Sequence, residues 1–170
     1  MNKTAVVFGS ALKTLTGTKE YQDTVLIGEI LATKGYKVKS GGYYGIMEAI
    51  SKGVSEAGGI AIGHTCATFP TTKGNQYLTE TIPGSDIYDR LRLLIEGTHV
   101  FILQRGGVGT LTELFLTMDI VRKMKENKPK IILVGGFWND IIESVSVCFN
   151  PGEEEMITII TDYKEISNLI

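Results

Sequence analysis

Two charged residues next to glycine-rich turns are the candidates for chemistry in this sequence. Arg90 falls early in a segment with helical periodicity, and Glu113 falls in the first turn of the helix predicted after the glycines at 106–109. Arginine offers five donors in a rigid fork that suits a phosphate or a carboxylate. A carboxylate stabilises developing positive charge and accepts a proton from water. We expect the helix dipole to keep Glu113 ionised near neutral pH.

Both residues also have a purely structural interpretation, which the sequence leaves open. Arg90 could form only a surface ion pair with Asp86, just before the same predicted helix, or with Asp89 within it. Glu113 could serve only to complement the dipole of its own helix. Neither interpretation requires a ligand, because both residue types are common on helix surfaces.

Three turns of small residues are the candidate binding elements in a chain with 20 glycines and 4 prolines. Unpaired N–H groups at a helix N-terminus favour an anion such as phosphate, and glycine lets the backbone approach it without a Cβ. The alternative to a binding role is that these glycines only allow tight turns to close. This alternative becomes less convincing if all three turns converge on one cleft. The candidate phosphate- or nucleotide-binding residues are Gly9, Ser10, Gly41, Gly42, Gly45, Met47, Arg105, Gly106, Gly107, Val108, Gly109 and Thr110.

Familiar phosphate-binding motifs do not match these turns. The pattern G-x-x-x-x-G-K-[ST] is absent from the sequence. Residues 107–112 approach G-x-G-x-x-G, but Thr112 stands where the third glycine belongs, and the run follows a late strand rather than the first. A dinucleotide site is therefore poorly supported, and a mononucleotide or a sugar phosphate fits better.

Short apolar runs alternate with longer helical patterns along the chain, and these elements must position the turns. The expected strands are 4–8, 36–39, 60–62, 99–103, 130–134 and 157–160, and the expected helices are 19–35, 45–58, 87–97, 110–125, 137–149 and 163–169. Residues 65–86 are expected to form one long irregular region. The pattern predicts an α/β fold, a three-layer Rossmann-like sandwich with a mainly parallel, doubly wound sheet, in a single domain over residues 1–170. Ligands of such sheets bind beyond the carboxyl ends of the strands.

Composition limits the class of protein further. Hydrophobic residues at 43%, charged residues at 21% and a net charge of −2 are typical of a packed globule and exclude the basic surface of a nucleic-acid binder. No apolar stretch approaches the roughly 18–20 residues of a membrane helix. The two cysteines, Cys66 and Cys148, and the two histidines, His64 and His99, support neither a disulfide framework nor a zinc-finger spacing. We expect a cytoplasmic protein without a metal or other cofactor.

The last glycine-rich turn carries a family resemblance. Residues 105–113, Arg-Gly-Gly-Val-Gly-Thr-Leu-Thr-Glu, resemble the P-G-G-x-G-T-x-x-E motif of the Lonely Guy (LOG) family. Arg90 stands where the family has the arginine of its M-x-x-R-K segment, 23 positions before Glu113 as in the family. Residues 40–47 resemble the family's G-G-G-x-x-G-L-M turn, and residues 7–11 its F-x-G-S-S opening. The likeness extends from the first strand to about residue 142.

The resemblance implies an enzyme. LOG proteins are phosphoribohydrolases that cleave the N-glycosidic bond of cytokinin nucleotides, and often AMP, to free base and ribose 5-phosphate without a metal. By resemblance, Arg90 and Glu113 are the catalytic residues, and the turns at 41–45 and 107–110 hold the 5′-phosphate. The resemblance also implies a homodimer. The residues that would face the partner are Met118, Val121 and Met124. Packing in the core of a single chain explains the same spacing equally well.

Several departures from the family pattern keep other hypotheses open. Arg105 replaces the family's proline, Leu91 replaces the lysine after the arginine, and Thr112 replaces the first of two adjacent glutamates. The region 65–86 also lacks the family's usual I-P-x-x-L sequence. The main rival hypothesis is a non-catalytic carrier or sensor that holds a nucleotide or a molybdenum-cofactor-like molecule in the same cleft. A third hypothesis is a structural protein with a vestigial cleft.

Overall fold

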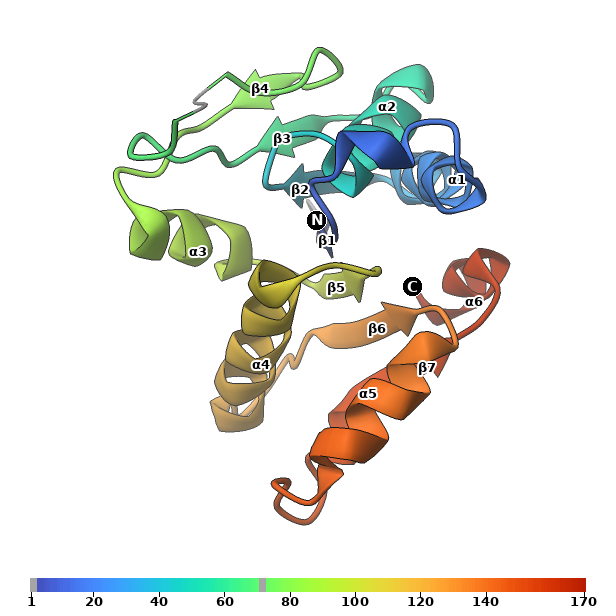
Figure 1. Ribbon diagram of the computed structural model, residues 1–170, viewed down its shortest axis with the longest axis vertical. Helices are drawn as coiled ribbons and strands as arrows, with labels where there is room; N and C mark the ends of the chain where they lie inside the picture. Colours follow the sequence, from blue (N-terminus) through green and yellow to red (C-terminus); the bar gives the residue numbers. More distant parts are fainter. Residues whose placement is uncertain (1–2, 71–72) are drawn as a thin grey trace.

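A seven-stranded parallel sheet forms the centre of the molecule in the computed structural model, which describes residues 3–70 and 73–170 (Figure 1). The strands lie in the order β4-β3-β2-β1-β5-β6-β7, and each neighbouring pair is parallel. Their bounds are β1 (Lys3–Phe8), β2 (Tyr36–Ser40), β3 (Ala61–Gly63), β4 (Glu80–Thr81), β5 (Val100–Leu103), β6 (Lys130–Val134) and β7 (Ile157–Ile160).

Helices cover both faces of the sheet, and this makes the fold a three-layer sandwich (Figure 1). One face carries α1 (Lys19–Thr33), α2 (Ile46–Glu56) and α6 (Ile166–Leu169). The other carries α3 (Ile87–Ile95), α4 (Val108–Lys123) and α5 (Phe137–Ser146). Short 3-10 turns lie at Lys13–Leu15, Glu154–Met156 and Tyr163–Glu165.

Strand β1 shows why the apolar runs of the sequence become central strands. Ala5 and Val7 belong to the core cluster under α1 and α2, whereas Val6 and Phe8 belong to the cluster under α3, α4 and α5. All four are buried, because a strand covered on both faces needs apolar side chains on both. β-Branched residues such as Val6 and Val7 also fit the pleated backbone well.

The predicted fold class is confirmed, and the sheet is parallel throughout its described strands. Apart from shifted element ends and the short 3-10 turns at Lys13–Leu15 and Glu154–Met156, the elements differ from the prediction in two places. The region 65–86 contains the edge strand β4, which has no sequence signal because its two residues are both exposed. The predicted last helix is a 3-10 turn followed by the four residues of α6. Residues 71–72 of the region 65–86 lie outside the described residues.

The order of the strands reverses between β1 and β5, and this reversal opens a crevice. β1 leads into α1 on one face, while β5 leads into α4 on the opposite face. The two strands are paired up to their last residues, since Phe8 lies opposite Leu103. The turns that follow them therefore leave the sheet side by side and diverge, which is where doubly wound sheets bind ligands.

The helices are all short compared with the width of a membrane. No helix in residues 3–70 and 73–170 combines the length and the apolar character that a bilayer crossing requires. The longest, α4, has 16 residues and ends with Arg122 and Lys123.

Candidate active site

A cleft of about 750 Å³ opens at the carboxyl ends of β1 and β5. This volume is within the range of small-molecule sites. Within the described residues, Arg90 and Glu113 are the two charged side chains of the lining, and most of the remainder is apolar or glycine. The lining consists of Val7, Phe8, Gly9, Ser10, Ala11, Leu12, Gly41, Tyr43, Met47, Phe69, Ile87, Arg90, Leu91, Gly107, Gly109, Thr110, Thr112 and Glu113.

Arg90 and Glu113 meet in this cleft. Nη1 of Arg90 lies 3.9 Å from Oε1 of Glu113, at the outer limit of an ion pair. Nε of Arg90 donates to the backbone carbonyl of His64, which follows β3, at 2.7 Å. Arg90 is 7% exposed, so its charge is directed inward and not toward a surface partner. The alternative interpretation, a surface ion pair with Asp86 or Asp89, does not hold, because the ion pair that Arg90 forms within the described residues is with Glu113.

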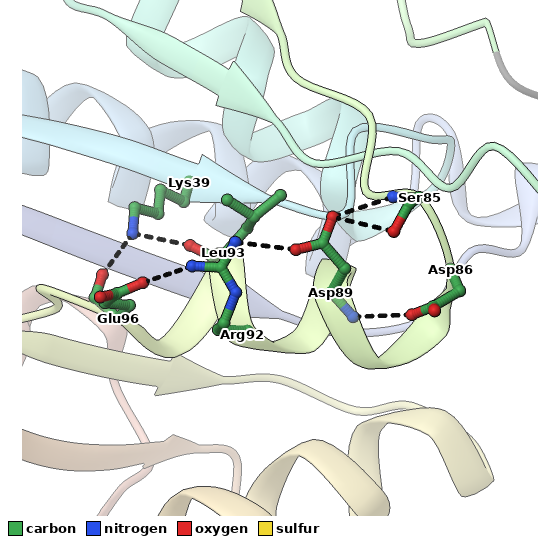
Figure 2. A network of polar contacts seen from close by, with 7 residues as sticks. All are labelled: Lys39, Ser85, Asp86, Asp89, Arg92, Leu93 and Glu96. Carbon is green, nitrogen blue, oxygen red and sulfur yellow. Dashed lines mark hydrogen bonds and ion pairs between the residues drawn. The ribbon is translucent and has the colours of Figure 1, made fainter.

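The two aspartates stabilise the beginning of α3 instead (Figure 2). The Asp86 carboxylate accepts the backbone N–H of Asp89 at 2.9 Å, which is an N-terminal cap. The Asp89 carboxylate accepts the backbone N–H of Ser85 and pairs with Arg92. The Ser85 N–H and Arg92 lower the pKa of Asp89. The start of the helix that carries Arg90 is thus fixed by local hydrogen bonds.

A lysine from the neighbouring strand fixes the other end of α3 (Figure 2). Nζ of Lys39 in β2 donates to the carbonyls of Leu93 and Glu96 at 2.9 and 2.7 Å. These carbonyls belong to the last turn, where a helix leaves acceptors unpaired and favours a cation. Burial lowers the pKa of Lys39, although Glu96 opposes this shift. With both ends held, α3 presents Arg90 to the cleft from a fixed backbone.

Glu113 is a buried carboxyl with a raised pKa. Its side chain is 13% exposed, and burial raises its pKa to about 7, although Arg90 lowers it. The expectation that the helix dipole keeps it fully ionised near neutral pH is wrong for two reasons. α4 begins at Val108, so Glu113 lies in the second turn, beyond the strongest field of the helix end. The loss of hydration also disfavours the charged form more than Arg90 at 3.9 Å favours it.

Ser10 joins the three glycine turns through its backbone. Its N–H donates to the carbonyl of Arg105 at 3.0 Å, and its carbonyl accepts the N–H of Ile46 at 2.9 Å. The first amide of α2 is therefore already bonded within the protein. The turn at 41–45 contributes less to an anion site than the sequence predicts.

The N-terminus of α4 is the better anion site. The helical ladder begins with the N–H of Leu111 donating to the carbonyl of Gly107, so the amides of residues 108–110 precede it. A Cβ on Gly107 or Gly109 would meet no atom within 4 Å, because both glycines border open space. Both also line the cleft. Anions are favoured at such a helix end.

Most of the predicted site residues line the cleft, and five do not. Those in the lining are Gly9, Ser10, Gly41, Met47, Arg90, Gly107, Gly109, Thr110 and Glu113. The five outside it are Gly42, Gly45, Arg105, Gly106 and Val108. Sequence spacing brought these residues to the correct end of the sheet but did not determine which side chains face the open space.

The residues outside the lining have other contacts. Gly42 and Gly45 adopt positive φ, and each packs against backbone, namely that of Gly63 and Ser10. A Cβ on Gly106 would collide with the side chain of Thr110. The guanidinium of Arg105 lies over the ring of Phe137, 5.3 Å from its centroid, and Val108 is exposed to solvent.

Sequence reasoning missed three aromatic residues of the lining, Phe8 at the end of β1, Tyr43 and Phe69. Tyr43 stands at a variable position of the glycine-rich turn, and Phe69 lies in the irregular region 65–86, which has no periodicity to interpret. Met118 and Val121 of α4 lie in the core of their own chain, and Met124 packs against it. No group of three His, Cys, Asp or Glu side chains in the described part of the chain is arranged to hold a metal ion.

The fold and the cleft define a Rossmann-type α/β protein with a cleft of small-molecule size where the strand order reverses. The family model described as the SLOG cluster4 family matches residues 2–164. The chain therefore belongs to the SLOG cluster4 family, and the LOG resemblance of its motifs is confirmed.

Known proteins with similar sequence or structure differ in their activities. Cytokinin riboside 5′-monophosphate phosphoribohydrolase LOG5 of Arabidopsis thaliana is 29% identical over 146 residues, which cover 81% of this chain and 62% of that protein. The molybdenum cofactor binding protein of Rippkaea orientalis superposes with a TM-score of 0.79 at 20% identity, over 99% of this chain and 95% of that one. The molybdenum cofactor carrier protein of Chlamydomonas reinhardtii gives 0.77 at 19% identity, over 99% and 96%. At these identities the two structures show the shared fold alone.

Proposed function

We propose that this protein hydrolyses the N-glycosidic bond of a purine ribonucleoside 5′-monophosphate to free base and ribose 5-phosphate. The observation that carries the proposal is the meeting of Arg90 and Glu113, 3.9 Å apart, in a cleft that also contains the N-terminus of α4. The similarity to a phosphoribohydrolase of Arabidopsis supports it. Adenine, with or without a substituent on N6, is the base proposed from that similarity.

The 5′-phosphate binds at the N-terminus of α4. The amides of residues 108–110 donate to its oxygens, and Gly107 and Gly109 let the phosphate approach the backbone closely. Phosphate binding anchors the ribose in the cleft, and this binding energy orients C1′ toward the reacting groups. The base lies against the apolar part of the lining, which includes Leu12, Ile87 and Leu91.

Glu113 acts on the ribose and on the attacking water. Cleavage breaks the bond between C1′ and the base nitrogen and builds positive charge on the ribose ring, which the ionised carboxylate stabilises. The oxygen of water then bonds to C1′, and Glu113 accepts a proton from that water. The departing base nitrogen takes up a proton from solvent and Glu113 returns its own proton to solvent, so the net change is the addition of one water across the broken bond. A pKa of about 7 suits this role, because about half of the carboxyl groups are ionised at neutral pH and the base is still strong enough to take a proton.

Arg90 holds Glu113 and contributes positive charge to the cleft. Its Nε is committed to the carbonyl of His64, whereas its two Nη groups remain for Glu113 and for the ligand. Leu91, where LOG proteins have lysine, adds no charge, so Arg90 is the cation that lines the cleft within the described residues. Lysine at position 90 would lose the fork geometry that lets one group contact both partners.

The test is release of base from AMP and from N6-prenylated AMP, followed by chromatography. We expect wild-type protein to release base and Glu113→Gln to release it at least about 10²-fold more slowly, the usual effect of removing a general base. An exposed matched control, Glu126→Gln, should retain the wild-type rate. Undiminished release by Glu113→Gln would show that Glu113 is not the base.

Leu91 favours a second candidate function, a non-catalytic carrier or sensor. It gives the cleft an apolar side chain where the hydrolases have a positive charge, and the molybdenum cofactor binding protein and carrier protein share the fold. In this function the cleft holds a phosphate-bearing molecule without cleaving it. Saturable stabilisation of the protein by AMP, with no base released over hours, would support the carrier and reject the hydrolase.

A further inference from the structure

Two aromatic rings meet at the buried guanidinium of Arg90. Tyr43 follows β2, and Phe69 lies in the connection between β3 and β4; their ring centroids are 6.2 Å apart, with 27° between the ring planes. The guanidinium carbon of Arg90 lies 5.8 Å from each centroid. A cation within about 6 Å of a ring face is attracted by the quadrupole of the ring. The three side chains therefore form one cluster in the cleft wall.

Backbone bonds at Cys66 hold both rings in place. The Tyr43 hydroxyl accepts the N–H of Cys66 at 2.9 Å, and the carbonyl of Cys66 accepts the N–H of Phe69 at 3.2 Å. Cys66 also forms a parallel bridge with Gly84, which packs so closely on α3 that a Cβ there would lie 2.6 Å from the backbone nitrogen of Arg90. The segment that carries Phe69 is thus built against the start of the helix that carries Arg90.

The hydrogen bond to His64 leaves the orientation of the guanidinium incompletely determined. It fixes Nε at 2.7 Å from the carbonyl of His64, but the plane of the group can still turn about that bond. On one side Gly41 leaves room for Nη2, because any Cβ there would collide with that atom. The rings of Tyr43 and Phe69 occupy further directions in which the plane could turn.

We propose that Tyr43 and Phe69 are positioning residues that hold the Arg90 guanidinium in the single orientation in which Nη1 faces Glu113. The effect of this orientation on turnover rests on the proposed hydrolase function. The positioning of the guanidinium by the two rings does not depend on that function. The irregular region 65–86 thereby has a defined role, since it delivers one of the two rings.

Four variants test the positioning role. Phe69→Leu and Tyr43→Leu remove one ring each and keep an apolar side chain, and Phe69→Tyr restores a ring at position 69. Phe69 is half-buried in a loop, so its replacement leaves the core untouched. The matched control is Tyr36→Leu: Tyr36 is as buried as Tyr43 and also has a cation over its ring, Lys3, but it begins β2 at the end away from the cleft.

Nuclear magnetic resonance supplies two measurements that need no turnover, namely proton exchange at Nε of Arg90 and the titration of the Glu113 carboxyl. In Phe69→Leu and in Tyr43→Leu we expect faster proton exchange at Nε of Arg90. We also expect the Glu113 titration to move to higher pH, because the cation spends less time beside the carboxyl. The kcat for base release should fall by about 2-fold to 30-fold, the range equivalent to cation–π energies, with KM less affected. Phe69→Tyr and Tyr36→Leu should match wild type in all of these.

Two results would overturn the proposal. One is a folded Phe69→Leu protein with unchanged Nε exchange and unchanged Glu113 titration. The other is the same set of changes in Tyr36→Leu, which would mean that any loss of a buried ring loosens Arg90. If Tyr43→Leu does not fold, Phe69→Leu decides alone. If wild-type protein releases no base, the hydrolase function fails, and the two resonance measurements still decide the positioning role.

Discussion

Glu113 illustrates at the scale of one residue how a protein sets the strength of a base. The carboxyl lies in a largely apolar cleft, with its nearest cation at 3.9 Å and already hydrogen-bonded elsewhere. Burial therefore outweighs attraction, and the pKa rises from 4.5 to about 7. A shorter ion pair would stabilise the charged form and weaken the base. The loose contact between Arg90 and Glu113 thus suits proton transfer better than a tight salt bridge would.

The raised pKa of Glu113 predicts a pH-dependent cost in stability. Below pH 4.5 the carboxyl is protonated in both the folded and the unfolded chain. Between pH 4.5 and 7 it ionises in the unfolded chain first, which favours unfolding as the pH rises. Relative to Glu113→Gln, wild-type protein should lose about 3 kcal/mol of unfolding free energy between pH 4 and pH 8. Urea unfolding of both proteins across this range measures the difference; parallel curves would contradict the raised pKa, and Glu126→Gln is the exposed control.

The same ionisation predicts the pH dependence of the proposed reaction. Because the ionised carboxyl is the active form, kcat/KM for base release should rise with pH and level off above a midpoint near 7. Rates measured from pH 5 to pH 9 with AMP give this profile. A rate that is flat between pH 5.5 and 8 would mean that another group, or the fully ionised carboxylate, carries the step.

At the scale of elements, glycines do two different things in this fold. Gly28 in α1 and Gly53 in α2 let the two helices cross in contact: a Cβ on Gly28 would lie 2.7 Å from the carbonyl oxygen of Ile50, and one on Gly53 would collide with the carbonyl of Val25. Both obstacles are backbone and do not move easily. At the N-terminus of α4, by contrast, glycine leaves space for a ligand.

This contrast predicts opposite outcomes for two matched substitutions. Gly53→Ala should lower the unfolding free energy by about 3 kcal/mol, because it forces α1 and α2 apart, and should leave nucleotide affinity nearly unchanged in the folded fraction. Gly109→Ala should leave stability unchanged or raise it by up to about 1 kcal/mol, because alanine favours the helix. It should also raise the Kd for AMP at least about tenfold, because its methyl group enters the anion site. Calorimetry measures the affinity for AMP, and chemical unfolding measures the stability of each variant. Equal affinities for wild type and Gly109→Ala would place the phosphate elsewhere.

At the scale of the whole molecule, the cleft joins the two halves of the sheet. β1 and β5 belong to the two halves. Residues 9–12 after β1 supply one part of the lining, and Gly107 with the first turns of α4 supplies the opposite part. A ligand bound there contacts both halves and stabilises the folded state as a unit. With free AMP at 100 times its Kd, the unfolding free energy should rise by about 2.7 kcal/mol. The rise should persist in Glu113→Gln and shrink in Gly109→Ala; no rise at any AMP concentration would reject a nucleotide site.

The homodimer implied by the family resemblance remains a prediction at this scale. Met118 and Val121 lie inside the chain's own core, so a contact through α4 would use its exposed apolar residues, among them Phe115 and Val108. Sedimentation should then show twice the chain mass of 18.6 kDa for wild type and a single chain for Phe115→Glu. Val147→Glu, at an exposed apolar residue outside α4, is the control. A wild-type protein that sediments as a single chain at all concentrations would contradict the dimer.

Local sequence carried enough information for the order of the main strands and helices and for the two charged residues at the cleft. Apolar runs and helical periodicity depend on the immediate neighbours of each residue, so they predicted a parallel sheet, and the family motifs brought Arg90 and Glu113 to one place. The two-residue strand β4 was not predicted, because it has no apolar run of its own and is defined only by its pairing with β3.

Only the tertiary structure determined three features of the site. These are the protonation of Glu113, which glycines border open space, and the aromatic cluster around Arg90. Each depends on distances between segments far apart in the sequence. The pKa of Glu113 reflects the burial produced by several elements together. The aromatic cluster joins Tyr43 and Phe69, from two different connections, to Arg90 in α3. Desolvation and ring contacts act through space over a few ångströms, and no local pattern of residue types records which distant groups will share that space.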